Sequence, residues 1–163
     1  MTFSCRCPRP VRGRSINRSA FVPTIWALDS ILQPGNPNKI PSNSLEKAQR
    51  IGKVRDEGMQ RALAAGVKMA YGTDAGVFPH KENNKDFPLL VSLGMRPLDV
   101  LRSATSWAAD LIRKPDRGRI APGNLADLVA FKGDPLANIS ILTQAPTLVM
   151  LDGKQVSIAT LSL

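Results

Sequence analysis

The hydrophobic and polar positions of this 163-residue chain follow two patterns, which meet near residue 118. Before that point, apolar residues recur every three to five positions over long segments, which is typical of helices with one buried face. After it, short apolar runs alternate with turn residues, which is typical of short strands. We therefore expect a basic, disordered tail at residues 1–19, an α/β region at 20–117 and a small β domain at 118–163.

The α/β region is predicted to contain several helices. They lie at residues 44–65, 86–93, 96–105 and 106–112. Gly52 and Gly58 weaken the first helix and are candidate break points in it. Its buried face includes Ile51 and Val54. Its solvated face is formed by four basic residues, Lys47, Arg50, Lys53 and Arg55. Pro97 stands at a first-turn position, where proline is well tolerated.

Strands are predicted on either side of the first helix. The apolar run at residues 20–26 is predicted to form a short strand, with Pro23 at a strand end because proline fits poorly in a fully paired position. Residues 29–43 form a loop, which is either a plain connection or a lid above the strand end. In the β domain, residues 126–131 form a strand, and Asp152-Gly153 is a strong signal for a two-residue hairpin. The pair Pro122-Gly123 predicts a type II turn.

One stretch combines a strand with a carboxylate. Gly66 ends the first helix, the apolar residues of 67–73 alternate as in a strand, and small residues then surround Asp74. In α/β units the chemistry lies at the carboxyl ends of the strands. Asp74 therefore has two interpretations: it is a turn residue that bonds nearby backbone N–H groups, or it is a functional residue, either a metal ligand or a general base. His80, the sole histidine, follows on the same loop and is either inert or faces a ligand.

The charge and cysteine content narrow the function classes. The net charge is +9, and five arginines of the first twenty residues supply more than half of it. No aromatic residue is interleaved with these arginines, so a nucleic-acid interface is disfavoured. Cys5 and Cys7 lack the spacing of a metal site and are expected to be free thiols. With no apolar run near the ~18 residues of a membrane span, and no signal sequence or structural disulfide, a cytoplasmic location is expected.

Taken in order, a set of short motifs resembles the carboxyl-terminal part of the amidohydrolase superfamily, near its imidazolonepropionase-like and Xaa-Pro dipeptidase-like branch. The motifs are Val22-Pro23-Thr24, Gly72-Thr73-Asp74-Ala75-Gly76, Gly94-Met95-Arg96-Pro97-Leu98, Gly118-Arg119-Ile120-Ala121-Pro122-Gly123-Asn124-Leu125-Ala126-Asp127-Leu128-Val129 and Gly133-Asp134-Pro135-Leu136. The resemblance covers about residues 20–156, and it is the ordered set rather than any single motif that is specific.

The resemblance implies a fold and a site. It implies the last two strands and helices of a (β/α)8 TIM barrel, followed by strands of a small β-sandwich. Asp74 matches the family's aspartate at the end of the last barrel strand. That residue ligates a divalent metal, usually zinc, and accepts a proton from the metal-bound water, which attacks an amide or ester carbonyl. By similarity, His80 and Asn83 lie on the loop that faces a small amide or dipeptide-like substrate.

The chain also departs from this family. The family takes further ligands from histidines and a lysine on earlier strands, whereas His80 is the only histidine here. A complete barrel needs roughly 250 residues, so the chain is expected to be a fragment, inactive and poorly soluble alone. Two alternatives remain open. One is an interaction protein that pairs through open barrel edges, with itself or with a complementing chain. The other is a nucleic-acid binder that uses the arginine tail.

Overall fold

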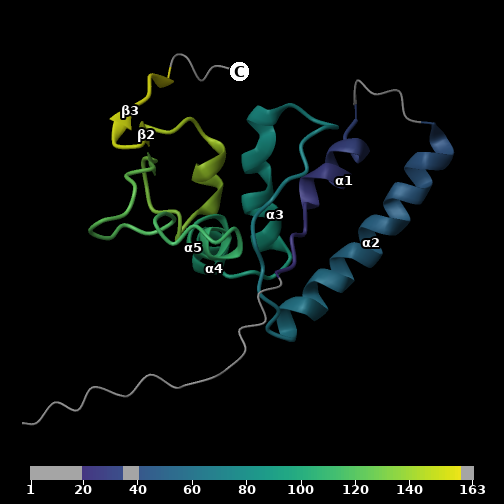
Figure 1. The fold of residues 1–163 in the computed structure, drawn as a ribbon. Helices are drawn as coiled ribbons and strands as arrows, with labels where there is room; N and C mark the ends of the chain where they lie inside the picture. The colour runs from purple at the N-terminus through teal and green to yellow at the C-terminus, as the bar shows by residue number, and fades with distance from the viewer. Residues whose placement is uncertain (1–19, 35–40, 159–163) are drawn as a thin grey trace, which may run out of the picture.

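A computed structural model describes residues 20–34 and 41–158 and shows a mixed helix and strand protein (Figure 1). The first helices are α1 (Ile25–Leu32) and α2 (Ser42–Ala64), followed by the 3-10 helix η1 (His80–Lys85). Next come α3 (Asp86–Ser92), α4 (Pro97–Ala104) and α5 (Ser106–Leu111). The last part holds β1 (Leu128–Ala130), the 3-10 helix η2 (Ile139–Thr143), β2 (Leu148–Leu151) and β3 (Lys154–Gln155). The tail predicted at 1–19 lies outside the described residues.

Helix α3 lies at the centre of the fold. In Figure 1 it stands between α1 and α2 on one side and the sheet with η2 on the other. It packs against α1, α4, η1 and η2, so segments far apart in the sequence meet on it. The main hydrophobic cluster draws on α1 to α4, η2 and the segments between them: Ile25, Met59, Met69, Leu90, Met95, Val100, Ile139 and Leu142. Both the segment before residue 118 and the segment after it therefore contribute to one core.

The first predicted strand is shorter than expected. Only Phe21 pairs, in parallel, with Met69: the Phe21 N–H donates to Lys68 O at 2.9 Å, and the Ala70 N–H donates to Phe21 O at 3.0 Å. The prediction of a strand through residue 26 is wrong, because α1 already begins at Ile25. Pro23 and the left-handed backbone of Thr24 (φ 44°) end the extended segment, and the apolar residues that follow suit a helix equally well.

The predicted loop at residues 29–43 is also wrong at both ends. Residues 29–32 belong to α1, and α2 starts at Ser42. Between these helices, residues 35–40 are outside the described part of the chain. The loop that follows Asp74 also contains more structure than expected, because His80–Lys85 forms η1. The apolar run at the start of α1 fits a strand or a helix equally well, and the polar residues of η1 show no hydrophobic periodicity.

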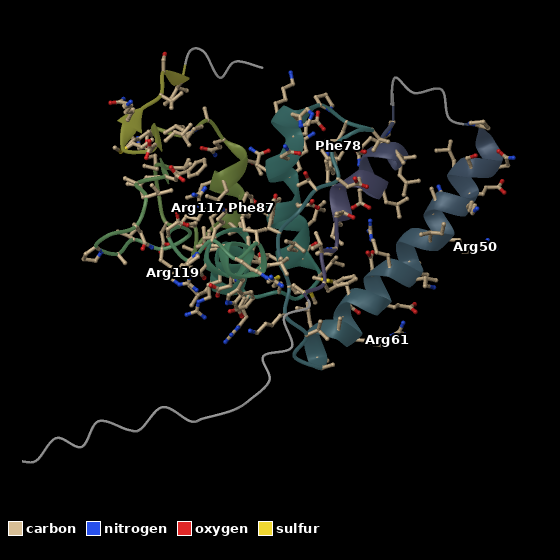
Figure 2. All side chains as sticks on the ribbon, in the orientation of Figure 1. Arg50, Arg61, Phe78, Phe87, Arg117 and Arg119 are labelled. Atoms are coloured by element: carbon tan, nitrogen blue, oxygen red, sulfur yellow. The ribbon has the colours of Figure 1, made fainter. Side chains whose placement is uncertain are left out.

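Helix α2 is continuous over its 23 residues. Gly52 and Gly58 do not break it. Its predicted faces need two corrections. Ile51 and Val54 are exposed, and Arg55 is not part of the solvated face because it forms ion pairs with Asp29 and Asp56. Arg50 does face outward, as Figure 2 shows for Arg50 and Arg61.

The substitution Gly58→Ala is expected to stabilise the chain by about 0.5–1 kcal/mol, because alanine is the better helix former. A Cβ atom at this position meets no atom within 4 Å, so no clash offsets the gain. The measurement is the midpoint of urea unfolding. Gly52→Ala is the matched control, where the added Cβ lies in ordinary contact, 3.7 Å from Leu28 Cδ2. A lower midpoint for Gly58→Ala would contradict this reading of α2.

The three helices after Asp86 agree with the sequence. Pro97 takes the first position of α4, as predicted. Helix α5 is separate from α4 and ends at Leu111, because Thr105 leaves helical geometry (φ −124°, ψ −95°) between them. None of the helices in the described ranges is both long enough and apolar enough to cross a membrane.

The last part of the chain forms a three-stranded antiparallel sheet in the order β1-β2-β3. Val129 stands opposite Val149, and Met150 opposite Gln155. The Asp152-Gly153 hairpin is confirmed, and both of its residues have positive φ (51° and 73°), as a type I′ turn requires. The helix η2 between β1 and β2 was not predicted. Its start is capped by Asn138 Oδ1, which accepts from the Ser140 N–H.

Candidate functional site

Asp74 lies at the end of a buried extended segment. Met69 and Ala70 are buried and pair with Phe21, and the Tyr71 N–H donates to Ser103 O of α4 at 3.0 Å. Gly72 permits a close approach to the neighbouring segment, since a Cβ atom there would lie 2.6 Å from Val22 Cγ1. Asp74 itself is exposed. Contacts with Phe21 and with Ser103 therefore hold the segment on two sides. The residue that follows it, Asp74, exposes its carboxylate.

The backbone of Asp74 is left-handed, with φ 51°. This conformation is uncommon for a residue other than glycine, although aspartate tolerates it better than most. The chain turns sharply here, away from the strand direction and into the loop that leads to η1. Neighbouring contacts have to hold such a turn in place.

Asn83 is the predicted site residue that lies beside this strand end. The Thr73 hydroxyl donates to Asn83 Oδ1 at 2.7 Å, and the Tyr71 hydroxyl donates to Asn83 O at 2.5 Å. The Tyr71 ring stacks on Phe87, with 4.4 Å between ring centroids. Burial, together with the nearby Asp86 charge, raises the pKa of Tyr71 far above its ordinary value. The phenol therefore stays protonated and keeps its role as a donor.

His80 is placed differently. It is the first residue of η1, and its side chain is exposed. Across the described residues, no hydrogen bond or ion pair joins His80 to Asp74. The structure thus brings Asn83 to the strand end and leaves His80 on the surface of the same loop.

Trp26 connects the start of α1 to η1. Its Nε1–H donates to Glu82 Oε2 at 3.0 Å, and Lys85 Nζ lies 3.0 Å from the same oxygen and 4.3 Å from the centre of the indole ring. Phe78 meets the indole edge-on at a centroid distance of 6.3 Å, in the upper part of Figure 2. This cluster fixes the loop after Asp74 against α1.

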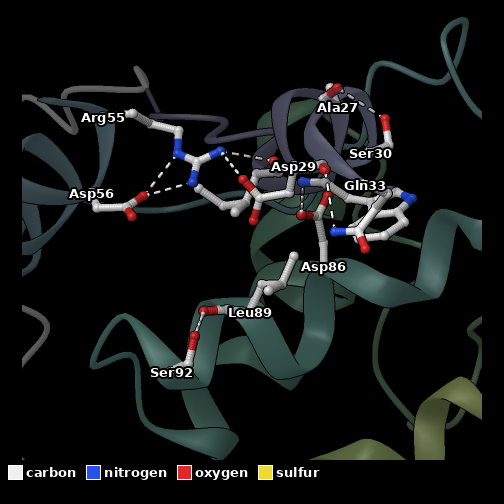
Figure 3. A network of polar contacts seen from close by, with 11 residues as sticks. Ala27, Asp29, Ser30, Gln33, Arg55, Asp56, Asp86, Leu89 and Ser92 are labelled. Carbon is white, nitrogen blue, oxygen red and sulfur yellow. Dashed lines mark hydrogen bonds and ion pairs between the residues drawn. The ribbon is translucent and has the colours of Figure 1, made fainter. Parts of the chain in front are cut away.

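Asp86 is a buried carboxylate that the sequence reasoning missed. One oxygen, Oδ1, accepts from the Trp26 N–H at 2.6 Å and so caps α1 from a position 60 residues later (Figure 3). The other oxygen, Oδ2, has no hydrogen-bond partner among the described atoms. Burial raises the pKa of Asp86 to about 6, while the Trp26 N–H and the charge of Arg55 act in the opposite direction. In the sequence, an aspartate at the start of a helix suggests a cap for that same helix. No residue near Asp86 indicated that it would cap α1 instead.

Arg55 holds α1 from the side of α2. Its Nη1 donates to Ile25 O at 2.9 Å and lies 2.8 Å from Asp29 Oδ1, while Nη2 lies 2.7 Å from Asp56 Oδ1. Figure 3 shows the guanidinium between the two carboxylates. Because Asp86 and Arg55 act on the same short helix, they fix the segment that follows Phe21 and Val22.

A separate cavity of about 690 Å³ lies between α3–α5 and the sheet. Its lining is largely apolar and includes Phe87, Leu101, Ala108, Val129, Phe131 and Leu142. Asp74, His80 and Asn83 do not line it; Asn84, whose Nδ2 donates to Leu142 O at 3.1 Å, does. The cavity is therefore distinct from the strand end that carries Asp74.

The described residues do not by themselves fit a metal ion. Within residues 20–34 and 41–158, no three His, Cys, Asp or Glu side chains are grouped so that they could hold one. A catalytic zinc site normally has three protein ligands. Asp74 offers one carboxylate, so further ligands would have to come from outside this part of the chain.

A family model and known proteins match this chain in sequence. A model of the Amidohydrolase family matches residues 20–156. An imidazolonepropionase of Salinispora tropica is 35% identical over 75 residues, which are 43% of this chain and 19% of that protein. An imidazolonepropionase of Streptomyces griseus subsp. griseus is 37% identical over the same shares.

Solved structures match over more of the chain. A Xaa-Pro dipeptidase with bound methionine superposes with a TM-score of 0.74 at 36% identity, over 85% of this chain and 34% of that one. A prolidase in complex with N-methylphosphonate-L-proline gives 0.76 at 29% identity, over 85% and 35%. This chain thus spans about a fifth of its curated relatives and about a third of these structures. With a family match over residues 20–156 and a fold shared with these enzymes, the chain belongs to the amidohydrolase family.

Proposed function

We propose that this chain is the carboxyl-terminal part of a metal-dependent amidohydrolase that hydrolyses C–N bonds in cyclic amides or dipeptide-like substrates. One observation carries the proposal: an exposed carboxylate, Asp74, follows a buried segment that pairs in parallel with a neighbour. The names of its relatives, imidazolonepropionase and Xaa-Pro dipeptidase, agree with that reaction class.

The proposed architecture is a partial barrel followed by part of a sandwich. The paired segments at Phe21 and Met69 would be the last two strands of a (β/α)8 barrel, within residues 20–117. The sheet β1-β2-β3 would belong to the small β domain at 118–163. Parallel pairing of the two segments supports this assignment, since a barrel of this class is built from parallel strands.

Within the proposed site, Asp74 is the metal ligand and the proton acceptor. The divalent metal, which we propose to be zinc, would supply an activated water and polarise the substrate carbonyl. The residues described here do not complete its ligand set, so this chain's own contribution is a carboxylate that can accept a proton at the strand end. His80 and Asn83 are proposed to face the substrate from the following loop.

We propose that the chain is inactive without the rest of a barrel. The alternative, a protein that pairs through its open edges with a second copy or a complementing chain, is favoured by its exposed apolar side chains. They include Val54, Ile112, Ile120, Val129 and Leu151. Large exposed apolar surfaces commonly mark interaction sites. In both the hydrolase and the edge-pairing alternative, further strands or helices would be needed to cover these exposed apolar side chains.

The first experiment is the mass of the native polypeptide in its source cells, measured by blot and intact mass spectrometry. A species near 17.6 kDa would show that the short chain is produced, and the alternative would then gain weight. A species above roughly 40 kDa, as a barrel of about 250 residues with a further domain requires, would support the hydrolase.

A second experiment tests the chemistry. The chain is co-expressed with a polypeptide carrying about six barrel strands of a relative, and metal content and hydrolysis of a Met-Pro dipeptide are measured. We expect neither with the chain alone and both with the pair. Asp74→Asn should abolish hydrolysis, whereas Asp110→Asn, at an exposed carboxylate paired with Arg119, should not. Chelator-sensitive turnover by the chain alone, lost in Asp74→Asn, would refute the proposed inactivity.

A further inference from the structure

Two hydroxyl groups of the segment before Asp74 bond to one residue of the following loop. Tyr71 donates to the main-chain oxygen of Asn83, and Thr73 donates to its side-chain oxygen. We infer that Asn83 is a positioning residue, which closes the loop onto the strand end and so fixes the direction in which Asp74 presents its carboxylate. This inference deepens the proposed function and rests on the role proposed there for Asp74.

The two bonds act together because of strand geometry. Side chains two residues apart in an extended segment point to the same face, so Tyr71 and Thr73 can reach the same partner. Asn83 accepts the two bonds with different atoms, its Oδ1 and its main-chain oxygen. The bonds therefore restrict both its side chain and its backbone. We call this set of three residues the clamp. The clamp closes the base of the segment formed by the loop at residues 74–79 and the first part of η1.

The position of Asp74 makes the clamp necessary. Asp74 follows Thr73 directly, its backbone is left-handed at φ 51°, and its side chain is exposed. A non-glycine residue is less favourable in that conformation than in an ordinary one. Burial cannot hold an exposed side chain in one direction, so the backbone on both sides has to do so. The clamp joins the two flanks of the turn.

Other contacts support the clamp from behind. The Tyr71 ring is stacked on Phe87 of α3, and its N–H is bonded to Ser103 O of α4. Neighbouring Asn84 bonds instead to Leu142 O of η2 and takes no part in the clamp. Asn83 therefore ties the loop to a strand end that α3 and α4 support.

The test measures backbone order at Asp74 by ¹⁵N relaxation of the full chain. Rigid backbone has an order parameter of about 0.85 and flexible backbone falls below about 0.6. We expect the rigid value in the unmodified chain and the flexible value in Thr73→Val and Asn83→Ala. Thr73→Ser, which restores the donor, is expected to return the rigid value. Asn84→Ala is the matched control, an asparagine one position along whose bond lies outside the clamp.

The Asp152 amide, also at positive φ but in the β2–β3 hairpin, should remain unchanged in every variant. A rigid Asp74 in Thr73→Val, or a mobile one in the unmodified chain, would overturn the inference. So would a failure of Thr73→Ser to restore order in a variant whose hairpin remains intact. The measurement needs neither metal nor turnover. Loss of the proposed hydrolase activity in the co-expression experiment would therefore leave this result standing, and the reverse also holds.

Discussion

Replacing Asp86 with asparagine is expected to flatten the pH dependence of the unfolding free energy between about pH 4 and about pH 7. The Asp86 carboxyl is buried at 1% exposure, its Oδ2 has no partner among the described atoms, and its pKa is raised from 3.8 to about 6. At about 1.4 kcal/mol for each pKa unit, this one group changes the unfolding free energy by about 3 kcal/mol across that range.

The sign follows from which state binds the proton more tightly. The folded chain holds the Asp86 proton up to about pH 6, whereas the unfolded chain releases it near 3.8. Acid therefore favours the folded state, and the stabilisation present below about pH 4 is lost as the pH rises through about 6. Asp29 adds to this shift in the pKa and Arg55 opposes it. The side-chain amide introduced by Asp86→Asn keeps an oxygen for the Trp26 N–H and carries no charge.

Urea unfolding followed by tryptophan fluorescence at several pH values provides the measurement. The quantity to compare is the slope of unfolding free energy against pH, because other carboxylates contribute equally to both proteins. Asp86→Ala is the control for the cap itself and should be less stable than Asp86→Asn at every pH by about 1–2 kcal/mol, because the Trp26 N–H loses its acceptor. Equal slopes in the unmodified chain and Asp86→Asn would show that Asp86 does not titrate in this range.

Met69→Ala is expected to lower the unfolding free energy by about 2–5 kcal/mol, which is the usual cost of truncating a fully buried large side chain. Met69 is 1% exposed and belongs to the main hydrophobic cluster. It also stands opposite Phe21 at the parallel pairing, where a void would weaken both segments. The strand end that carries Asp74 would then lose the packing of Met69 in the hydrophobic cluster.

Val67→Ala is the matched control for Met69→Ala. Val67 lies two residues earlier in the same segment but is 43% exposed, so its truncation should change the unfolding free energy by no more than about 0.5 kcal/mol. Chemical denaturation of both variants measures the difference. A similar loss of stability in the two variants would mean that burial does not distinguish Met69 from Val67 in this segment.

Local chemistry made much of the fold predictable. Asp152-Gly153 marked its hairpin because a type I′ turn demands positive φ at both residues, and Pro97 marked the start of α4. The start of α1 at Ile25 was not predictable in this way. Its first turn is completed by Asp86 and Arg55, which are distant in sequence. Pattern alone could not distinguish a short helix from a short strand there.

In the candidate site, too, the features set by local sequence were predictable and those set by distant residues were not. The sequence pointed to Asp74 because a strand followed by small residues and a carboxylate is a local pattern, and the structure places that carboxylate in the open after a buried segment. The bonds of Asn83 to Tyr71 and Thr73 required the path of the loop, which no spacing specifies. The prediction that Arg55 lies on the solvated face of α2 was wrong, because α1 packs against α2 and brings Asp29 into an ion pair with Arg55.

The cap that Asp86 provides for α1 has a consequence for synthesis on the ribosome. The Trp26 N–H receives its acceptor from a residue that is made 60 positions later. As a chain grows at about 5–20 residues per second, α1 emerges several seconds before its cap and has to wait in an incomplete form. Its apolar residues, Ile25 among them, are exposed to chaperones and to other nascent chains during that interval. Completion of α3 is therefore the event that ends this vulnerable period.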